Sequence, residues 1–242
     1  MFMLTDEKFN SLQIIFKHRI KVNNDYLYIY HDEYDDEEPD WNEHIEEHCG
    51  ACDYATGASK IVLFYEDIEN WVVKLPFFGD YYESTGEYTN YCKANKYLPI
   101  CSDNDYCEAE AYLTDKAIEY GVGDMFAKTY YLGNLNGVPV YVSEKIEETV
   151  ASGRGNYNYF RINSAKETQE LFNFYSYELD EAGFSPYNES TLRFFVDQYG
   201  QKKTEKMIQF IMDYQIDDLH SANIGFDKCG KIKIIDYSGF HY

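Results

Sequence analysis

Two carboxylates and an amide near the end of the chain have the spacing of a metal-binding and proton-accepting site. The stretch Asp217–Asn223 reads DDLHSAN, and Asp236 follows Asn223 by thirteen residues, directly after a pair of isoleucines. Carboxylate and amide oxygens are ligands that Mg²⁺ accepts, usually together with several waters. With Asn223 and Asp236 as metal ligands, Asp218 is left to accept a hydroxyl proton or to orient a nucleophile.

A lysine inside an apolar strand is the second chemical feature. Lys74 lies in the run WVVKL, where an ammonium group is costly to bury unless an acid is paired with it. The next helix along the chain offers Glu108 and Glu110, which are two residues apart and therefore point in different directions. The spacing alone leaves both glutamates open as the partner of Lys74.

The D-L-H-x-x-N stretch and the strand-borne Asp236 resemble the protein-kinase-like superfamily. They are more similar to aminoglycoside and other small-molecule kinases, or to bacterial protein kinases related to them, than to eukaryotic signalling kinases. The resemblance implies ATP and Mg²⁺ as cofactors, Asp218 as the catalytic aspartate, and Asn223 and Asp236 as metal ligands. His220 lies inside the motif as well, but in the resembling family the role of base belongs to the aspartate, so we expect His220 to shape the loop.

The same resemblance assigns the lysine and its partner. It implies that Lys74 contacts the α- and β-phosphates of the nucleotide and that a helix glutamate holds it. We favour Glu110 over Glu108, because its distance to Gly121 at the helix end resembles that in the small-molecule kinases.

Two further segments correspond to nucleotide-contacting parts of the family. Gly57–Val62 (GASKIV) keeps one glycine and the closing valine of the phosphate-covering loop, so backbone amides from Gly57 to Ser59 and the Ser59 hydroxyl are candidate phosphate ligands. An ordinary tight turn is the alternative. Residues 141–146, including Glu144, lie where the family has its adenine-contacting hinge, whose contacts are mostly from the backbone.

The chain departs from the family pattern at several positions. Asp217 and Ile216 stand before the catalytic aspartate where the protein kinases have Arg and His, and the glycine of the D-Y-S-G motif comes one position late. The sequence ends six residues after Asp236, where the family continues with helices that bind the acceptor. We therefore expect a reduced helical second lobe.

The elements that would position these residues follow from hydrophobic period and turn signals. We predict a helix over 4–20 and a helix over 104–120 that starts at an Asp105 N-cap and ends at Gly121. Predicted strands cover 25–31, 60–65 and 71–75, followed by a polar loop, and then 126–132 and 138–146 around a turn at 133–137. Beyond these we expect a loop over 150–163, helices over 164–182 and 189–214, and a β unit with strands 223–226 and 231–235.

This order predicts an α+β protein in which a sheet-rich lobe precedes a helical lobe. The resemblance implies a protein-kinase-like two-lobed fold, with an antiparallel-sheet N-lobe and a reduced helical C-lobe. We place the boundaries at 1–48 for an N-terminal helix and strand extension with an acidic loop, 49–149 for the N-lobe and 150–242 for the C-lobe. Between Lys21 and Lys60 the chain has twelve acids and no Lys or Arg. A solvated loop explains this run, and a contact surface for a basic partner is the alternative.

Composition restricts the partners and the compartment. A net charge of −22 argues against a nucleic-acid partner and against an anionic membrane surface. We find no signal-peptide pattern and no membrane-length apolar run, so we expect six reduced cysteines in a cytoplasmic protein. His44, His48, Cys49 and Cys52 allow a zinc site as an alternative, although adjacent His48 and Cys49 make four-ligand geometry awkward.

Three functions fit these features. The first is an ATP- and Mg²⁺-dependent phosphotransferase that acts on a hydroxyl of a protein or a small molecule. The alternatives are a nucleotide-binding pseudokinase that serves as an interaction module, and an enzyme on the same scaffold that transfers AMP.

Overall fold

The protein is mixed α+β with antiparallel sheets. The computed structural model describes residues 4–22, 27–31, 48–82, 84–90, 98–99, 105–150, 165–175, 177 and 189–238. The chain divides into two compact units, residues 1–111, 129–144 and 241–242 in the first and residues 112–128 and 145–240 in the second. The division falls inside helix α3 (Tyr106–Tyr120), which contributes to both. None of the described helices is long and apolar enough to cross a membrane.

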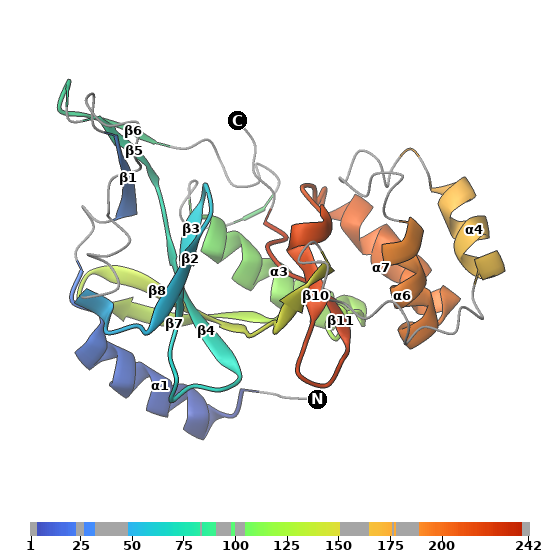
Figure 1. Ribbon diagram of the computed structural model, residues 1–242, viewed down its shortest axis with the longest axis horizontal. Helices are drawn as coiled ribbons and strands as arrows, with labels where there is room; N and C mark the ends of the chain where they lie inside the picture. Colours follow the sequence, from blue (N-terminus) through green and yellow to red (C-terminus); the bar gives the residue numbers. More distant parts are fainter. Residues whose placement is uncertain are drawn as a thin grey trace. The chain divides into compact units, whose positions relative to one another are not determined.

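A five-stranded antiparallel sheet forms the centre of the first unit (Figure 1). Its strands, in spatial order, are β2 (Asp53–Thr56), β3 (Lys60–Phe64), β4 (Trp71–Pro76), β8 (Val138–Glu144) and β7 (Thr129–Leu135). The predicted hairpins β3–β4 and β7–β8 are confirmed, with Val62 opposite Lys74 in the first and Thr129 opposite Ser143 in the second. Strand β2 was not predicted. Its residues are mostly exposed, so they show no apolar alternation.

The two faces of this sheet differ in chemistry. Ile61, Leu63, Val73 and Leu75 point to one face, where they share a buried core with Leu12 and Phe16 of helix α1 (Asp6–Arg19). Helix α1 runs along that face, as Figure 1 shows, and it confirms the helix predicted over 4–20. Since alternate strand residues point to opposite faces, Lys60, Val62 and Lys74 share the other face. The two lysines therefore lie on the face of the sheet opposite to α1.

The turn between β7 and β8 is tighter than the predicted 133–137. Strand β7 continues to Leu135, with an irregularity between Tyr131 and Gly133, and only Asn136 and Gly137 connect the strands. Both have positive φ, +57° and +95°, which is the pattern of a two-residue hairpin turn matched to strand twist. The Asn136 amide also donates to the backbone oxygens of Lys17 (3.1 Å) and Ile20 (2.7 Å), so this turn binds the end of α1.

A second, three-stranded sheet also belongs to the first unit. It contains β1 (Tyr28–His31), β5 (Gly79–Tyr82) and β6 (Glu87–Asn90), with β1 parallel and β6 antiparallel to β5. The strand predicted over 25–31 is confirmed from Tyr28 onward. The polar loop predicted after β4 is wrong where β5 and β6 lie. Strand β6 is exposed along its whole length, so no buried face imposes a hydrophobic period on its sequence.

The described residues of the second unit form the helices α4 (Ala165–Phe174), α6 (Glu189–Tyr199) and α7 (Gln201–Asp213), besides the later part of α3. The single helix predicted over 189–214 is wrong, because Gly200 adopts a φ of +80° between α6 and α7 and interrupts the helical backbone. Helix α4 confirms the first part of the helix predicted over 164–182, and residues 178–182 lie outside the described residues. So does the predicted loop over 150–163, apart from its first residue.

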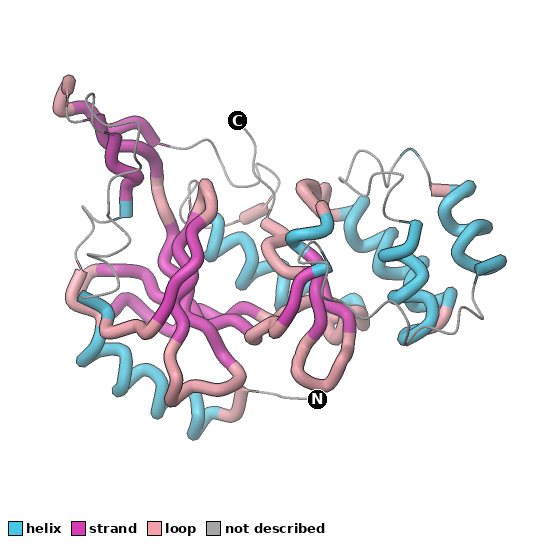
Figure 2. The backbone as a smooth tube through the Cα atoms, viewed as in Figure 1, coloured by secondary structure: helices cyan, strands magenta, loops and turns pink. Residues whose placement is uncertain are grey.

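A small antiparallel sheet carries the predicted catalytic segments. Strands β10 (Ile224–Phe226) and β11 (Ile232–Ile234) confirm the predicted β unit, and β9 (Glu148–Thr149) pairs with β10. Asp227 Oδ1 accepts the backbone N–H groups of Cys229 (2.8 Å) and Lys231 (3.0 Å), which fixes the connecting loop that Figure 2 shows between the strands. The Gln198 side chain of α6 bonds the Gly230 oxygen and the Ile232 amide, so it holds the hairpin from outside.

Replacing Asn136 by Ala is expected to lower the free energy of unfolding by about 1–3 kcal/mol. The variant loses two hydrogen bonds to α1, each worth roughly 1 kcal/mol, and places a Cβ-bearing residue without a polar side chain at positive φ. Asn136→Gly is the matched control, since it loses the same hydrogen bonds without the backbone strain. Urea unfolding should rank the wild type above Asn136→Gly and Asn136→Gly above Asn136→Ala. Equal midpoints for all three would contradict the role given to this turn.

Candidate functional site

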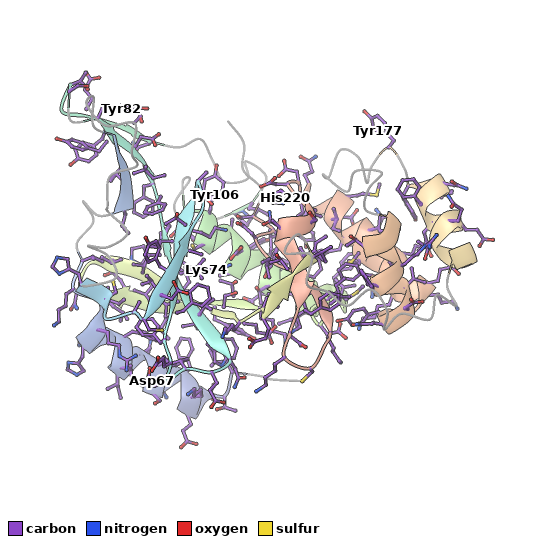
Figure 3. The ribbon with its side chains drawn as sticks, in the orientation of Figure 1. Asp67, Lys74, Tyr82, Tyr106, Tyr177 and His220 are labelled. Atoms are coloured by element: carbon purple, nitrogen blue, oxygen red, sulfur yellow. The ribbon has the colours of Figure 1, made fainter. Side chains whose placement is uncertain are left out.

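Lys74 is paired with a glutamate inside the first unit. Its Nζ lies 2.6 Å from Glu110 Oε2, and Glu110 is fully buried on α3. Lys74 itself is 6% exposed in the middle of β4, where Figure 3 labels it. Of the two candidate glutamates, Glu110 is the one in contact with Lys74, while Glu108 donates its backbone N–H to the Asp105 side chain.

A second lysine contacts the same carboxylate, and the sequence interpretation missed it. Lys60 Nζ lies 3.1 Å from Glu110 Oε1, and Lys60 is 3% exposed. Val62 pairs with Lys74 across the β3–β4 ladder, so Lys60, two residues before Val62, shares the face of Lys74. This alternation was the signal in the sequence. A lysine two residues before the strand partner of Lys74 lies on the same face of the sheet as Lys74.

A hydroxyl pair completes the surroundings of Glu110. The Thr129 hydroxyl donates to Glu110 Oε2 (3.1 Å) and lies 3.0 Å from the Ser143 hydroxyl on the neighbouring strand. Each oxygen of the carboxylate therefore accepts from a different lysine, and Oε2 also accepts from a threonine. Removing two charges from water costs several kcal/mol per ion, and a buried ion pair often stabilises a fold no better than apolar residues would. Stability alone therefore does not account for this cluster.

The beginning of α3 is fixed by a buried aspartate. Asp105 Oδ1 accepts the Glu108 amide (2.9 Å), which confirms the predicted N-cap, and its Oδ2 accepts the Tyr141 hydroxyl (2.7 Å). Burial raises the pKa of Asp105 to about 6. It also raises the pKa of the Tyr141 phenol, so this hydroxyl remains a donor. Tyr141 belongs to the segment predicted as an adenine hinge, and Glu144, at the end of the same strand β8, is buried.

The predicted phosphate loop is the turn between β2 and β3. The Gly57 amide donates to the Lys60 oxygen (3.0 Å), which closes this turn. The Gly57 N–H is thus engaged within the hairpin. The candidate phosphate ligands that are left in this turn are the backbone amides of Ala58 and Ser59 and the Ser59 hydroxyl. Ser59 is buried, and its backbone oxygen accepts from Phe77.

The second unit brings Asp218 and Asn223 together. Asn223 is buried at the start of β10, and its Nδ2 donates to the Asp218 backbone oxygen (2.9 Å). Because the side-chain nitrogen of Asn223 faces Asp218, the side-chain oxygen of Asn223 points the other way. The Asp218 side chain is 48% exposed, so this carboxylate is accessible to solvent.

His220 shapes the loop between these two residues. Its ring Nδ1 accepts the Ala222 amide (3.2 Å) and so caps the 3₁₀ turn η5 (Ser221–Asn223). Its Nε2 lies 3.6 Å from Asp218 Oδ1 (Figure 3 labels His220). The ring therefore orders the turn that leads to Asn223 and borders the Asp218 carboxylate.

Asp236 is the second residue after β11, and the residue before it is paired with Asn223. The Ile235 amide donates to the Asn223 oxygen (2.8 Å), which extends the β10–β11 pairing to the residue before Asp236. The residue after it, Tyr237, is fully buried, and its hydroxyl contacts the Ala127 oxygen (2.9 Å) and the Thr114 hydroxyl (2.6 Å). Asp236 is thus held from both sides along the chain while its own side chain is half-buried.

Both aspartates that the resemblance assigns to chemistry have left-handed backbone conformations. The φ of Asp218 is +59° and that of Asp236 is +52°. Such conformations cost a side-chain-bearing residue about 1–2 kcal/mol, and glycine would avoid the cost. Strained residues of this kind concentrate at functional sites, where the side chain is needed in an unusual direction.

The donor atoms in this loop suit a hard cation. Asn223 and Asp236 offer an amide oxygen and a carboxylate, and Mg²⁺ is commonly bound by one or two such groups together with waters and ligand phosphates. In the described part of the chain, no group of three or more His, Cys, Asp or Glu side chains is arranged to hold a metal. A Mg²⁺ site that completes its shell with waters and phosphates does not require such a group.

The alternative zinc cluster lies partly outside the described residues, because His44 does. Cys49 is buried, and burial raises the pKa of its thiol to about 12, whereas zinc binds the thiolate. Cys52 is exposed, and its sulfur contacts the Phe64 oxygen (3.2 Å). Among the described residues, neither Cys49 nor Cys52 belongs to a group of three or more side chains arranged to hold a metal.

Replacing Asp105 by Asn is expected to change the pH dependence of stability while keeping both contacts, because the Asn oxygen can accept the Glu108 amide and its Nδ2 can donate to the Tyr141 hydroxyl oxygen. The folded-state pKa of about 6 exceeds the ordinary value of 3.8, so the folded protein holds this proton more tightly than the unfolded chain does. The stability due to protonated Asp105 is full below about pH 4 and is lost as the pH rises through about 6. The free energy of unfolding of the variant should therefore rise relative to that of the wild type between pH 4 and 7, by up to roughly 3 kcal/mol.

Thermal unfolding across this pH range measures the gain. Asp67→Asn is a control of opposite sign, because the ion pair with Arg19 lowers the pKa of Asp67 and wild-type Asp67 stabilises more as the pH rises. If the difference in melting temperature between Asp105→Asn and the wild type stays the same across this pH range, a raised pKa at Asp105 is contradicted.

No family model matches this chain, and neither a curated protein nor a solved structure matches it. Inferences about function therefore rest on two local arrangements. One is the lysine–glutamate cluster on the sheet of the first unit, and the other is the loop with Asp218, Asn223 and Asp236 in the second.

Proposed function

We propose that this protein is an ATP- and Mg²⁺-dependent phosphotransferase with a kinase-like two-lobed fold, acting on a hydroxyl of a protein or a small molecule. The observation that carries the proposal is the buried Lys74–Glu110 pair, with 2.6 Å between Nζ and Oε2. A cytoplasmic location and the absence of nucleic-acid and membrane partners, expected from composition, belong to the same proposal.

The first unit would contact the nucleotide. Lys74 would donate to phosphate oxygens, and Glu110, fixed by Thr129 and by its burial, would keep the lysine extended along the sheet. An ammonium group that is already oriented needs no reorganisation when charge develops on a phosphate, which is the main way a protein stabilises such a transition state. The turn at Ala58 and Ser59 and the segment 141–146 with Glu144 would supply further contacts.

The second unit would supply the metal ligands and the acceptor aspartate. Asn223 and Asp236 would hold Mg²⁺, which when bound neutralises phosphate charge. Asp218 would orient the acceptor hydroxyl and take its proton as the new bond forms. The exposure of Asp218 and the strained backbone at Asp218 and Asp236 support these roles.

Nucleotide binding is the first expected outcome. ATP with Mg²⁺ should raise the melting temperature of the wild type, corresponding to about 2.7 kcal/mol at a hundredfold excess over the Kd. Asp236→Ala should lose the metal-dependent part of this shift. Asp213→Ala, which removes an exposed carboxylate from the end of α7, is the control of equal charge and should keep it. Absence of any shift in the wild type would refute the proposal.

Phosphoryl transfer is measured separately, because binding alone also fits an interaction module. Asp218→Asn should retain ATP binding and lose roughly 10²–10⁴-fold in turnover, measured as ATP hydrolysis or self-phosphorylation. Intact mass distinguishes a phosphoryl group from AMP on the modified protein. ATP binding without turnover in the wild type would favour the pseudokinase alternative.

A further inference from the structure

The two lysines around Glu110 are equivalent in their placement. Lys60 and Lys74 come from adjacent strands, lie on one face of the sheet and are both nearly inaccessible to solvent. Each donates to a different oxygen of the same carboxylate, at 3.1 Å and 2.6 Å. One lysine would have been enough to pair with Glu110. The second brings a further positive charge into the same buried space.

The turn that precedes Lys60 adds to its position. The Lys60 backbone oxygen accepts the Gly57 amide, so the lysine begins β3 at the base of the turn 57–59. A lysine at this point stands beside the backbone amides that were predicted to contact phosphate. Lys74 enters the same face from the next strand.

Two ammonium groups on one carboxylate are separated by little more than the width of that carboxylate and two hydrogen bonds. This spacing suits anionic groups that are joined to one another, as in a chain of phosphates, better than it suits a single phosphate. An ammonium group has three N–H donors, and Glu110 accepts one from each lysine. Glu110 would then hold both side chains in place while they contact the ligand.

We propose that Lys60 is a second phosphate-contacting residue, and that Lys60 and Lys74 together form a two-lysine site that selects ligands with two or more linked phosphates. This inference rests on the proposed function and specifies how its nucleotide is recognised. It predicts that linked phosphates bind without a metal ion, since both contacts come from lysines.

Binding of tripolyphosphate, pyrophosphate and orthophosphate in the presence of a chelator tests the selectivity. The wild type should bind tripolyphosphate at least tenfold more tightly than orthophosphate, by calorimetry. Lys60→Met should weaken the binding of tripolyphosphate and of ATP at least tenfold and bring it near that of orthophosphate. Lys60→Arg, which keeps the charge, should recover most of the affinity.

Lys203→Met is the control of equal charge change. Lys203 is half-buried and paired with Asp124 in the second unit, away from Glu110 in the chain and in its contacts. The control is needed because every lysine removed makes a protein of net charge −22 more repellent to anions. Equal affinities of Lys60→Met and Lys203→Met for ATP would overturn the role of Lys60.

A wild-type measurement decides the matter if Lys60→Met does not fold, as monitored by circular dichroism. An acyl phosphate of ATP reacts with a lysine close to the phosphates. The neutral ε-amine attacks the acyl carbonyl, the acyl C–O bond breaks, ATP leaves and the amine proton goes to solvent. Peptide mapping should find the acyl group on both Lys60 and Lys74, and excess ATP should suppress both.

The outcomes separate the two proposals. Labelling of Lys74 without Lys60 would overturn the two-lysine site and leave the nucleotide-binding function standing. A wild type that binds neither ATP nor tripolyphosphate would overturn the proposed function together with this inference.

Discussion

The burial of Glu110 constrains the whole sheet of the first unit. A fully buried carboxylate has to receive hydrogen bonds from groups that are themselves fixed, and here these come from two lysines and a threonine on three strands. Strands β3, β4 and β7 must therefore keep their register, because a slip of one residue would turn Lys60 or Lys74 to the apolar face beside α1. The Asp105 cap fixes the start of α3 and with it the position of Glu110 along the strands.

In the second unit, hydrogen bonds from side chains to the backbone take the place of a buried ion cluster. In the loop with Asp218, Asn223 and Asp236, side chains act as hydrogen-bond partners of backbone groups. Asn223 bonds the Asp218 oxygen, the His220 ring caps the following turn, and Asp227 closes the β10–β11 loop. These bonds offset the cost of positive φ at Asp218 and Asp236, so both carboxylates can project where a regular strand or helix would not place them.

Much of the fold could be predicted from sequence wherever a buried face imposes a period. Helix α1, the two hairpins of the large sheet and the β10–β11 unit all have this property and were predicted. Strands β2 and β6 are exposed, and no periodic signal marks them. The break at Gly200 required knowledge of a backbone angle, because a lone glycine inside an apolar helical pattern is tolerated in many helices.

For the candidate site, sequence reasoning found single residues better than it found their surroundings. The predicted partners Lys74 and Glu110 are in contact, and Asn223 lies against Asp218, but the roles assigned to these residues stay predictions. Lys60 was predicted at the start of a strand and at the end of the candidate phosphate loop, but no partner was assigned to its side chain. Its face is defined only once the β3–β4 register is known, and that register comes from the length of the connecting turn rather than from any property of Lys60 itself.

The large negative net charge makes the buried lysines around Glu110 more important for the binding of any anion. A protein of net charge −22 repels a nucleotide at a distance, although at physiological salt the repulsion is screened beyond roughly 8 Å. In the proposed function, attraction would therefore arise at short range, from the buried ammonium groups and from the bound metal ion. Lysines inside a sheet retain their effect at high salt because buried charges are screened much less than exposed ones. A nucleotide bound in this way would be recognised by fixed charges close to it, and long-range electrostatic steering would contribute little.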